Sequence, residues 1–270
     1  MSFTLHEKEN ISWTESSILP VQHMFTRRLG EVGDYPYSST YDPEWLRPER
    51  QERVRELWLR LQKAGDFSPN GFCFTRQVHG THIRYVDEAW QKMPPLPHVE
   101  PDCDGLITDR PGVPLVVFTA DCVPVLFADT EAGVVCAVHS GWKGTVRDMM
   151  GSAVSHMTRR GARVENIRAA IGPAIDKCCF ECGPEVKEAV EALLGADAEG
   201  LCPPEEGVPG KFMIDLKETN RRRLLQLGLP AEHIDVSPDC TICMQDVYWS
   251  HRATKGVRGT MASVIVLPNE

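Results

Sequence analysis

Three short apolar runs occupy the middle of the chain, with polar residues between them. The runs cover residues 115–118, 123–127 and 134–138, and each has the length of a strand and is bounded by turn residues. Short runs that are apolar at nearly every position are typical of buried strands. We therefore predict three buried strands here, and we expect the polar breaks between them to lie at strand ends.

Helical periodicity appears on both sides of these runs. Apolar residues recur at intervals of three and four in four segments, which are residues 43–64, 146–157, 184–194 and 216–227. Shorter apolar segments predict further strands at residues 72–74, 83–86, 164–171, 234–236 and 262–267. No internal repeat or linker divides the sequence. The pattern therefore predicts one α+β domain over residues 1–270, with strands in mixed order.

The composition narrows the class of protein. Of the 270 residues, 42% are hydrophobic, which is enough for a substantial core. The net charge of -9 argues against general nucleic-acid binding, because neutralising phosphates requires clustered Lys and Arg. No apolar run is long enough to span a bilayer, and the first residues lack the order of a signal peptide. We expect a cytoplasmic protein that acts on a small molecule and binds neither nucleic acid nor membrane.

Reactive side chains stand at the predicted strand ends. Cys122 and its neighbour Asp121 lie between the first two apolar runs, His139 follows the third, and His79 lies in a turn between two earlier strands. Two imidazoles and one thiolate provide three metal ligands and leave a fourth tetrahedral position open, which is typical of catalytic zinc. We predict that His79, Cys122 and His139 bind zinc. Asp121 is a candidate for orienting a ligand or moving protons.

A glycine-flanked turn after His139 leads into a predicted helix, whose first N–H groups can bind an anion. Lys143 adds a positive charge there, and Arg28 lies next to a glycine turn near the N-terminus. The alternative for Arg28 is a solvated hairpin edge. The predicted anion pocket beside the metal comprises Arg28, Ser140, Gly141, Lys143 and Arg252.

The chain contains ten cysteines. In a reducing compartment they are expected to be metal ligands, buried small side chains or reactive thiols, in preference to disulfides. Cys179 and Cys182 have the spacing of zinc ligands, and so do Cys240 and Cys243. Together they form a candidate four-thiolate zinc site, although the gap between the pairs is longer than in a zinc ribbon. The alternative is a set of buried thiols.

Five motifs carry a resemblance to a known family. They are RQVHG (76–80), DGLITDRPGVPLVVFTADCVPVLFAD (104–129), AVHSGWKGTV (137–146), AAIGPAIDKCCFECG (169–183) and DCT followed by WSHR (239–252). From about His23 to the C-terminus the chain resembles the YfiH-like laccase-domain family. The resemblance implies a layered sandwich of mixed sheets flanked by helices, with His79, Cys122 and His139 as zinc ligands. It also implies phosphorolysis of adenosine, inosine or methylthioadenosine, and deamination of adenosine.

The chain departs from the family pattern around the anion pocket. Lys143 replaces the arginine of the family's usual Gly-Trp-Arg-Gly motif. A lysine cannot bind phosphate through two parallel N–H groups, as an arginine does. Ala253 follows Arg252 where the family has a second arginine, and Thr260 follows Gly259 where the family has another. These changes leave the three predicted metal ligands in place and bear on the preferred substrate.

Two other functions use the same residues. A copper-dependent polyphenol oxidase, or laccase, could use the two imidazoles and the thiolate. A multicopper oxidase also needs His-x-His pairs, and none occurs among the nine histidines. A metal-free cysteine hydrolase or deamidase would use Cys122 as nucleophile and His139 as base, leaving His79 without a role. The predicted function is a zinc-dependent purine nucleoside phosphorylase with adenosine deaminase activity.

Overall fold

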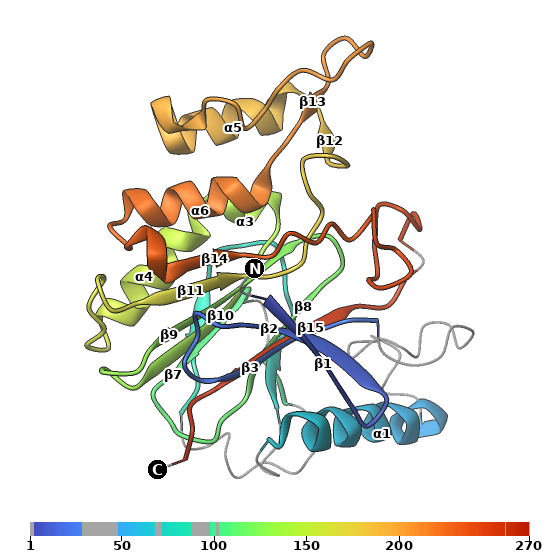
Figure 1. The fold of residues 1–270 in the computed structure, drawn as a ribbon, viewed down its shortest axis with the longest axis vertical. Helices are drawn as coiled ribbons and strands as arrows, with labels where there is room; N and C mark the ends of the chain where they lie inside the picture. Colours follow the sequence, from blue (N-terminus) through green and yellow to red (C-terminus); the bar gives the residue numbers. More distant parts are fainter. Residues whose placement is uncertain are drawn as a thin grey trace.

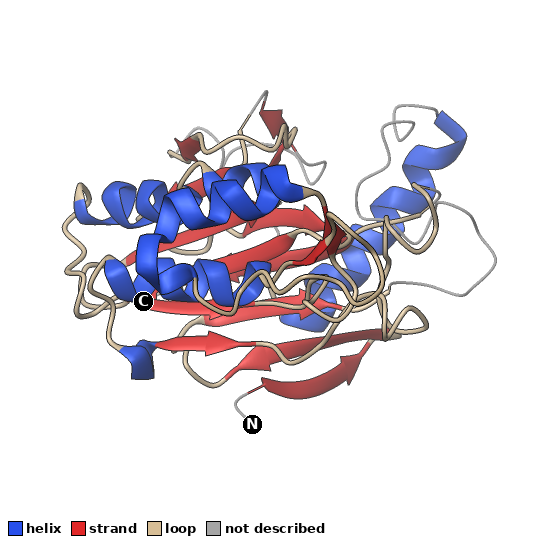
Figure 2. Ribbon diagram, turned by 90° about the horizontal axis from the view of Figure 1, so that it is seen from above, coloured by secondary structure: helices blue, strands red, loops and turns tan. Residues whose placement is uncertain are grey.

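Two β-sheets lie face to face, and helices cover their outer faces (Figures 1 and 2). The computed structural model describes residues 3–28, 48–67, 72–87, 98–100, 103–256 and 258–269, and all statements on the fold concern these residues. The α+β class with mixed sheets flanked by helices, predicted from the sequence, is confirmed. None of the described helices is long and apolar enough to cross a membrane.

The first sheet has seven strands in the order β1-β2-β3-β15-β8-β4-β6. Their bounds are β1 (Phe3–Lys8), β2 (Ile11–Ser16), β3 (Gln22–Thr26), β4 (Cys73–Thr75), β6 (His98–Glu100), β8 (Leu115–Thr119) and β15 (Met261–Val266). Helix α1 (Pro48–Gly65) packs on the outer face of this sheet through Trp58 and Leu61. Trp45 and Leu46, which belong to the helix predicted over residues 43–64, lie outside the described residues.

The second sheet has six strands in the order β14-β11-β9-β10-β7-β5. Their bounds are β5 (Ile83–Tyr85), β7 (Gly105–Thr108), β9 (Val123–Asp129), β10 (Val134–Ser140), β11 (Arg168–Ile171) and β14 (Ile234–Val236). Two further strands, β12 (Glu181–Cys182) and β13 (Phe212–Met213), form a separate two-stranded sheet. The helices on the outer side of the six-stranded sheet are α3 (Trp142–Val146), α4 (Met149–Thr158), α5 (Pro184–Leu194) and α6 (Leu216–Gln226), with 3-10 turns at Gly195–Ala198 and Ala231–His233.

Alternating side chains of the central strands belong to different apolar layers. On β9, Val125 and Phe127 face the helices, whereas Leu126 faces the other sheet. On β8, Val117 packs between the sheets, whereas Val116 packs toward Trp58 of α1. Both faces of these strands are therefore buried, which explains why the sequence shows continuous apolar runs without a polar alternation.

The helix predicted over residues 146–157 differs from the observed one. Helix α3 begins earlier, at Trp142, and the chain then breaks at Asp148, which has a left-handed φ of 68°. The Asp148 side chain accepts the N–H of Gly151 and caps α4, and Arg223 of α6 binds both of its carboxylate oxygens. The cap and this ion pair stabilise a break that helical periodicity alone does not reveal.

Candidate metal centre

The register of the second sheet brings two of the predicted ligands together. Strands β9 and β10 are antiparallel, and His139 lies opposite Pro124. Cys122 precedes β9 by one residue, so the thiol reaches the end of β10 where the imidazole of His139 lies. The third ligand, His79, lies in the segment between β4 and β5. These two strands belong to different sheets, so this segment crosses between the sheets, as does the one carrying Cys122.

The three side chains have the separation that a metal ion requires. Their nearest ligand atoms all lie within 4.8 Å of one another, and Cys122 Sγ is 3.9 Å from His79 Nε2. A tetrahedral zinc ion places its sulfur and nitrogen ligands roughly 3.5 Å apart. A Cβ on Gly141 would lie 2.8 Å from His79 Cδ2 and 3.1 Å from Cys122 Sγ, so glycine allows the backbone to lie against the ligands. The donor set and its spacing therefore fit a metal ion.

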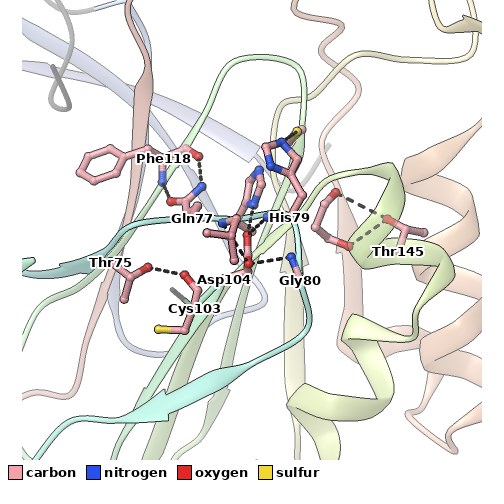
Figure 3. Close-up of polar contacts among 12 residues, drawn as sticks. Thr75, Gln77, His79, Gly80, Cys103, Asp104, Phe118 and Thr145 are labelled. Atoms are coloured by element: carbon pink, nitrogen blue, oxygen red, sulfur yellow. Dashed lines mark hydrogen bonds and ion pairs between the residues drawn. The ribbon is translucent and has the colours of Figure 1, made fainter. Parts of the chain in front are cut away.

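Asp104 holds two of the ligands and is a residue that sequence reasoning missed. Its Oδ1 lies 2.8 Å from His139 Nδ1, and its carboxylate accepts the backbone N–H groups of Val78, His79 and Gly80 (Figure 3). The contact at Nδ1 leaves His139 Nε2 free for a metal ion. The bonds to the backbone hold His79 at a left-handed φ of 61°. An acidic residue directly before the buried strand β7 was the signal available in the sequence.

The electrostatics favour a thiolate at Cys122 when no metal is bound. Burial opposes ionisation of this thiol, but the charge and hydrogen bonds of His139 and the contact with His79 outweigh it and lower the pKa of Cys122 to about 6. Burial also disfavours the imidazolium, yet the Cys122 thiolate and Asp104 raise the pKa of His139 to about 9. The two groups therefore form an ion pair that shares one proton.

This ion pair predicts the proton balance of metal binding. Between pH 6 and pH 9 the metal-free pair retains the proton on His139, and a metal ion must displace it to reach the imidazole. At pH 7.5 we expect zinc binding at this centre to release about one proton. Isothermal titration calorimetry in buffers of different ionisation enthalpy measures this number. Release of about two protons would mean that Cys122 is a neutral thiol and His139 an imidazolium before binding.

A cavity of about 150 Å³ adjoins the three ligands. It is lined by Thr75, Gln77, His79, Phe118, Thr119, Ala120, Cys122, His139, Arg258 and Thr260. Gln77 is fixed there by two hydrogen bonds of 2.7 Å to the backbone of Phe118 (Figure 3). Arg258 is a second residue that sequence reasoning missed. Its buried Nε has no hydrogen-bond partner among the described residues, so it can bind an anion in the cavity.

Asp121 connects the metal centre to the C-terminal segment. Its carboxylate accepts hydrogen bonds from Thr241 Oγ1 at 2.6 Å and from the backbone N–H of Arg252 at 2.7 Å. Its backbone carbonyl accepts the N–H of Ile175, and its φ of 90° is strained for a residue with a side chain. These contacts occupy both carboxylate oxygens, so they position the backbone that carries Cys122.

The five predicted anion-binding residues lie in different environments in the structure. The Ser140 hydroxyl is bonded to Thr145 and Asn220, and Gly141 lies against the metal ligands. Lys143 is exposed, with Nζ 5.7 Å from the Trp142 ring centroid. The guanidinium of Arg28 stacks 3.9 Å from the Trp249 ring centroid, and Arg252 Nη1 donates to Glu181 O. None of these five described residues lines the 150 Å³ cavity.

The predicted four-cysteine set needs one correction. The cluster consists of Cys178, Cys179, Cys240 and Cys243, and Cys182 is not part of it. Cys182 lies on the short strand β12, where it pairs with Phe212 of β13. The adjacent Cys178 takes its place, because the loop before β12 brings both neighbouring thiols toward Cys243.

Comparison with known proteins assigns the class to which this fold and metal centre belong. Residues 22–268 match the family model described as multi-copper polyphenol oxidoreductase laccase, and the chain belongs to this family. Purine nucleoside phosphorylase YlmD of Geobacillus stearothermophilus is 38% identical over 192 residues, covering 70% of this chain and 69% of that protein. Adenosine deaminase RL5 from an unknown prokaryotic organism is 36% identical over 204 residues, covering 74% and 76%.

A solved structure agrees with the family assignment. The crystal structure of Bacillus licheniformis hypothetical protein YfiH has a TM-score of 0.86 at 29% identity and covers 97% of this chain and 98% of that chain. The resemblance noted in the sequence motifs is therefore confirmed. The names of the curated relatives support an enzymatic function.

Proposed function

We propose that the protein is a zinc-dependent purine nucleoside phosphorylase that also deaminates adenosine. The observation that carries the proposal is the convergence of His79, Cys122 and His139 beside a cavity that also contains Arg258. Relatives that are named purine nucleoside phosphorylase and adenosine deaminase support the substrate class. Adenosine, inosine and methylthioadenosine are the proposed nucleosides, and phosphate is the proposed second substrate.

The proposed chemistry divides between the metal ligands and the cavity. His79, Cys122 and His139 would hold zinc, which would act as a Lewis acid when bound. Asp104 orients His139, and Asp121 positions the backbone beside Cys122. Arg258 would bind phosphate next to the nucleoside, because it lines the cavity and its buried Nε has no hydrogen-bond partner among the described residues.

A screen of nucleosides tests the reaction class. Each nucleoside is incubated with and without phosphate, before and after chelation, and products are separated by chromatography. Adenosine with phosphate is expected to give adenine and ribose 1-phosphate, and adenosine alone is expected to give inosine more slowly. Elemental analysis of the purified protein measures zinc and copper. Phenol oxidation by a copper-loaded protein, faster than nucleoside turnover, would support a polyphenol oxidase instead.

Replacing Arg258 by glutamine is expected to raise the KM for phosphate by about 10- to 100-fold, because a charge-assisted hydrogen bond contributes about 1.5–3 kcal/mol. Deamination of adenosine without phosphate is expected to change by less than about threefold, since no anion is then bound. Steady-state kinetics of both reactions measure the effect.

Lys143→Gln is the matched control, because Lys143 is exposed and does not line the cavity. If Lys143→Gln raises the KM for phosphate as much as Arg258→Gln does, the anion lies at the start of α3, as predicted from the sequence. A similar loss of both activities in Arg258→Gln would contradict a phosphate-specific role.

A cysteine hydrolase is the second candidate, because Asp104, His139 and Cys122 also form a chain of acid, base and lowered-pKa thiol. Alkylation separates the two candidates. A metal-bound thiolate at Cys122 is protected from iodoacetamide until the metal is chelated, whereas a free thiolate reacts at once. Rapid alkylation of Cys122 in the protein as purified, with loss of activity, would favour the hydrolase.

A further inference from the structure

Four cysteines converge outside the candidate active site. Cys178 and Cys179 lie in the loop after β11, and Cys240 and Cys243 lie in the segment after β14. Strands β11 and β14 are parallel neighbours, so the chain leaves both at the same end of the sheet (Figure 1). The pairing continues beyond the strands in a bridge between Ala174 and Cys240. The topology therefore brings together two pairs of thiols that are distant in the sequence.

The sulfur atoms have the spacing of ligands around one ion. Cys243 Sγ lies 3.5 Å from Cys178 Sγ and 3.5 Å from Cys179 Sγ, and the latter two are 3.6 Å apart. All four sulfurs lie within 4.8 Å of one another. Zn–S bonds of about 2.3 Å in a tetrahedron place the sulfurs about 3.8 Å apart. Three nearly equal distances form one face of such a tetrahedron, whereas a disulfide would single out one pair.

Backbone donors already surround one of the sulfurs. The backbone N–H groups of Asp176, Ile242 and Cys243 lie next to the Cys240 sulfur. Such N–H contacts stabilise thiolates that coordinate a metal ion.

A buried lysine fixes both loops. Lys217 of α6 is almost fully buried, and its Nζ lies 2.7 Å from Asp176 Oδ2. The same ammonium donates to the carbonyl oxygens of Ser237 at 2.8 Å and Asp239 at 3.1 Å. It therefore connects the residues that precede each cysteine pair, and the positions of the four thiols are defined by the fold before any ion binds.

We propose that Cys178, Cys179, Cys240 and Cys243 bind one zinc ion in a closed four-thiolate site. Four Zn–S bonds form and the thiol protons pass to solvent, which leaves two net negative charges on the site. The site has no open position for substrate, so its role is structural. Thr241, between two of the ligands, donates to Asp121, so the second zinc also stabilises the backbone next to Cys122.

The zinc content of purified protein tests the proposal. Together with the candidate active-site metal, we expect two zinc ions per chain in the unmutated protein and one in Cys178→Ser and in Cys243→Ser. Cys182→Ser is the matched control, because this thiol lies on β12 outside the cluster, and it is expected to retain two. Cys122→Ala is expected to retain the cluster zinc. Even if the active site binds no metal, the unmutated protein should contain one more zinc ion than Cys178→Ser. The test of this proposal is therefore independent of the proposed function.

Cobalt substitution gives a readout that requires no activity. Cobalt bound by four thiolates has strong sulfur-to-metal charge-transfer absorption. We expect this absorption to persist in Cys122→Ala and to fall in Cys243→Ser to the weaker band of a single thiolate at Cys122. Circular dichroism shows whether the variants are folded. If they are not, the test rests on the zinc content of the unmutated protein. A zinc content that is the same in the unmutated protein and both cluster variants overturns the proposal. So does a disulfide between any two of the four cysteines in protein purified without reductant and analysed by mass spectrometry.

Discussion

Replacing His139 by alanine is expected to remove the metal from the candidate active site and to lower both proposed activities by more than about 1,000-fold, which corresponds to about 4 kcal/mol of activation free energy. The imidazole is nearly fully buried at the end of β10, and it provides one of only three side-chain ligands in that group. Its loss leaves two ligands, which bind zinc weakly. Elemental analysis and the kinetics of phosphorolysis and deamination measure the two effects.

His82→Ala is the matched control. This histidine lies three residues after His79, is exposed and is outside the metal-binding group, so the variant should retain both metal and activity. If His139→Ala loses zinc and keeps both activities, the metal at this centre is structural and the proposed function fails. If the variant keeps its zinc at full occupancy, His139 is not a ligand.

Replacing Asp104 by asparagine is expected to weaken zinc binding at the active site by about 10- to 100-fold and to destabilise the fold by about 2–4 kcal/mol. Asp104 is fully buried and accepts hydrogen bonds from three backbone N–H groups as well as contacting His139. An amide group of the same shape brings an N–H toward these donors and leaves some of them without an acceptor. Competition with a chelator measures the affinity, and urea denaturation of the metal-free proteins measures the stability.

The pH dependence gives an internal check on this variant. Burial opposes ionisation of Asp104, but His139 and the backbone donors outweigh it and hold the pKa of Asp104 below its usual value. A carboxyl whose folded pKa is lowered stabilises the fold fully above its unfolded pKa of about 3.9 and loses that contribution as the pH falls. The stability difference between the two proteins should therefore shrink below about pH 4.

Asp109→Asn is the control for a lost carboxylate on the same strand segment. Asp109 follows β7 at its other end, where it accepts a hydrogen bond from Tyr85 and is partly exposed. The Asp109→Asn substitution should therefore have little effect on zinc affinity at the active site. Equal zinc affinities in Asp104→Asn and the unmutated protein would show that the contact with His139 Nδ1 does not orient the imidazole.

More of the core than of the candidate site could be predicted from the sequence. Strands at residues 115–118, 123–127 and 134–138 were predicted correctly, because burial on both faces leaves a continuous apolar signal. The break at Asp148 was missed, because it depends on a capping bond and on Arg223 from a distant helix. The metal ligands were candidates by residue type, but their convergence depends on strand register and on two segments that cross between the sheets.

From the sequence we could predict the α+β class, the buried strands, the three candidate ligands and the family resemblance, because residue chemistry and periodicity are local properties of the chain. Which side chains lie in contact depends on the tertiary fold. Asp104 reaches His139 through the antiparallel pairing of β7 and β10, Arg258 enters the cavity from the C-terminal segment, and Cys178 replaces Cys182 among the four thiols. Each of these contacts joins residues more than 30 positions apart, and their proximity follows from sheet order and register, which no local pattern encodes.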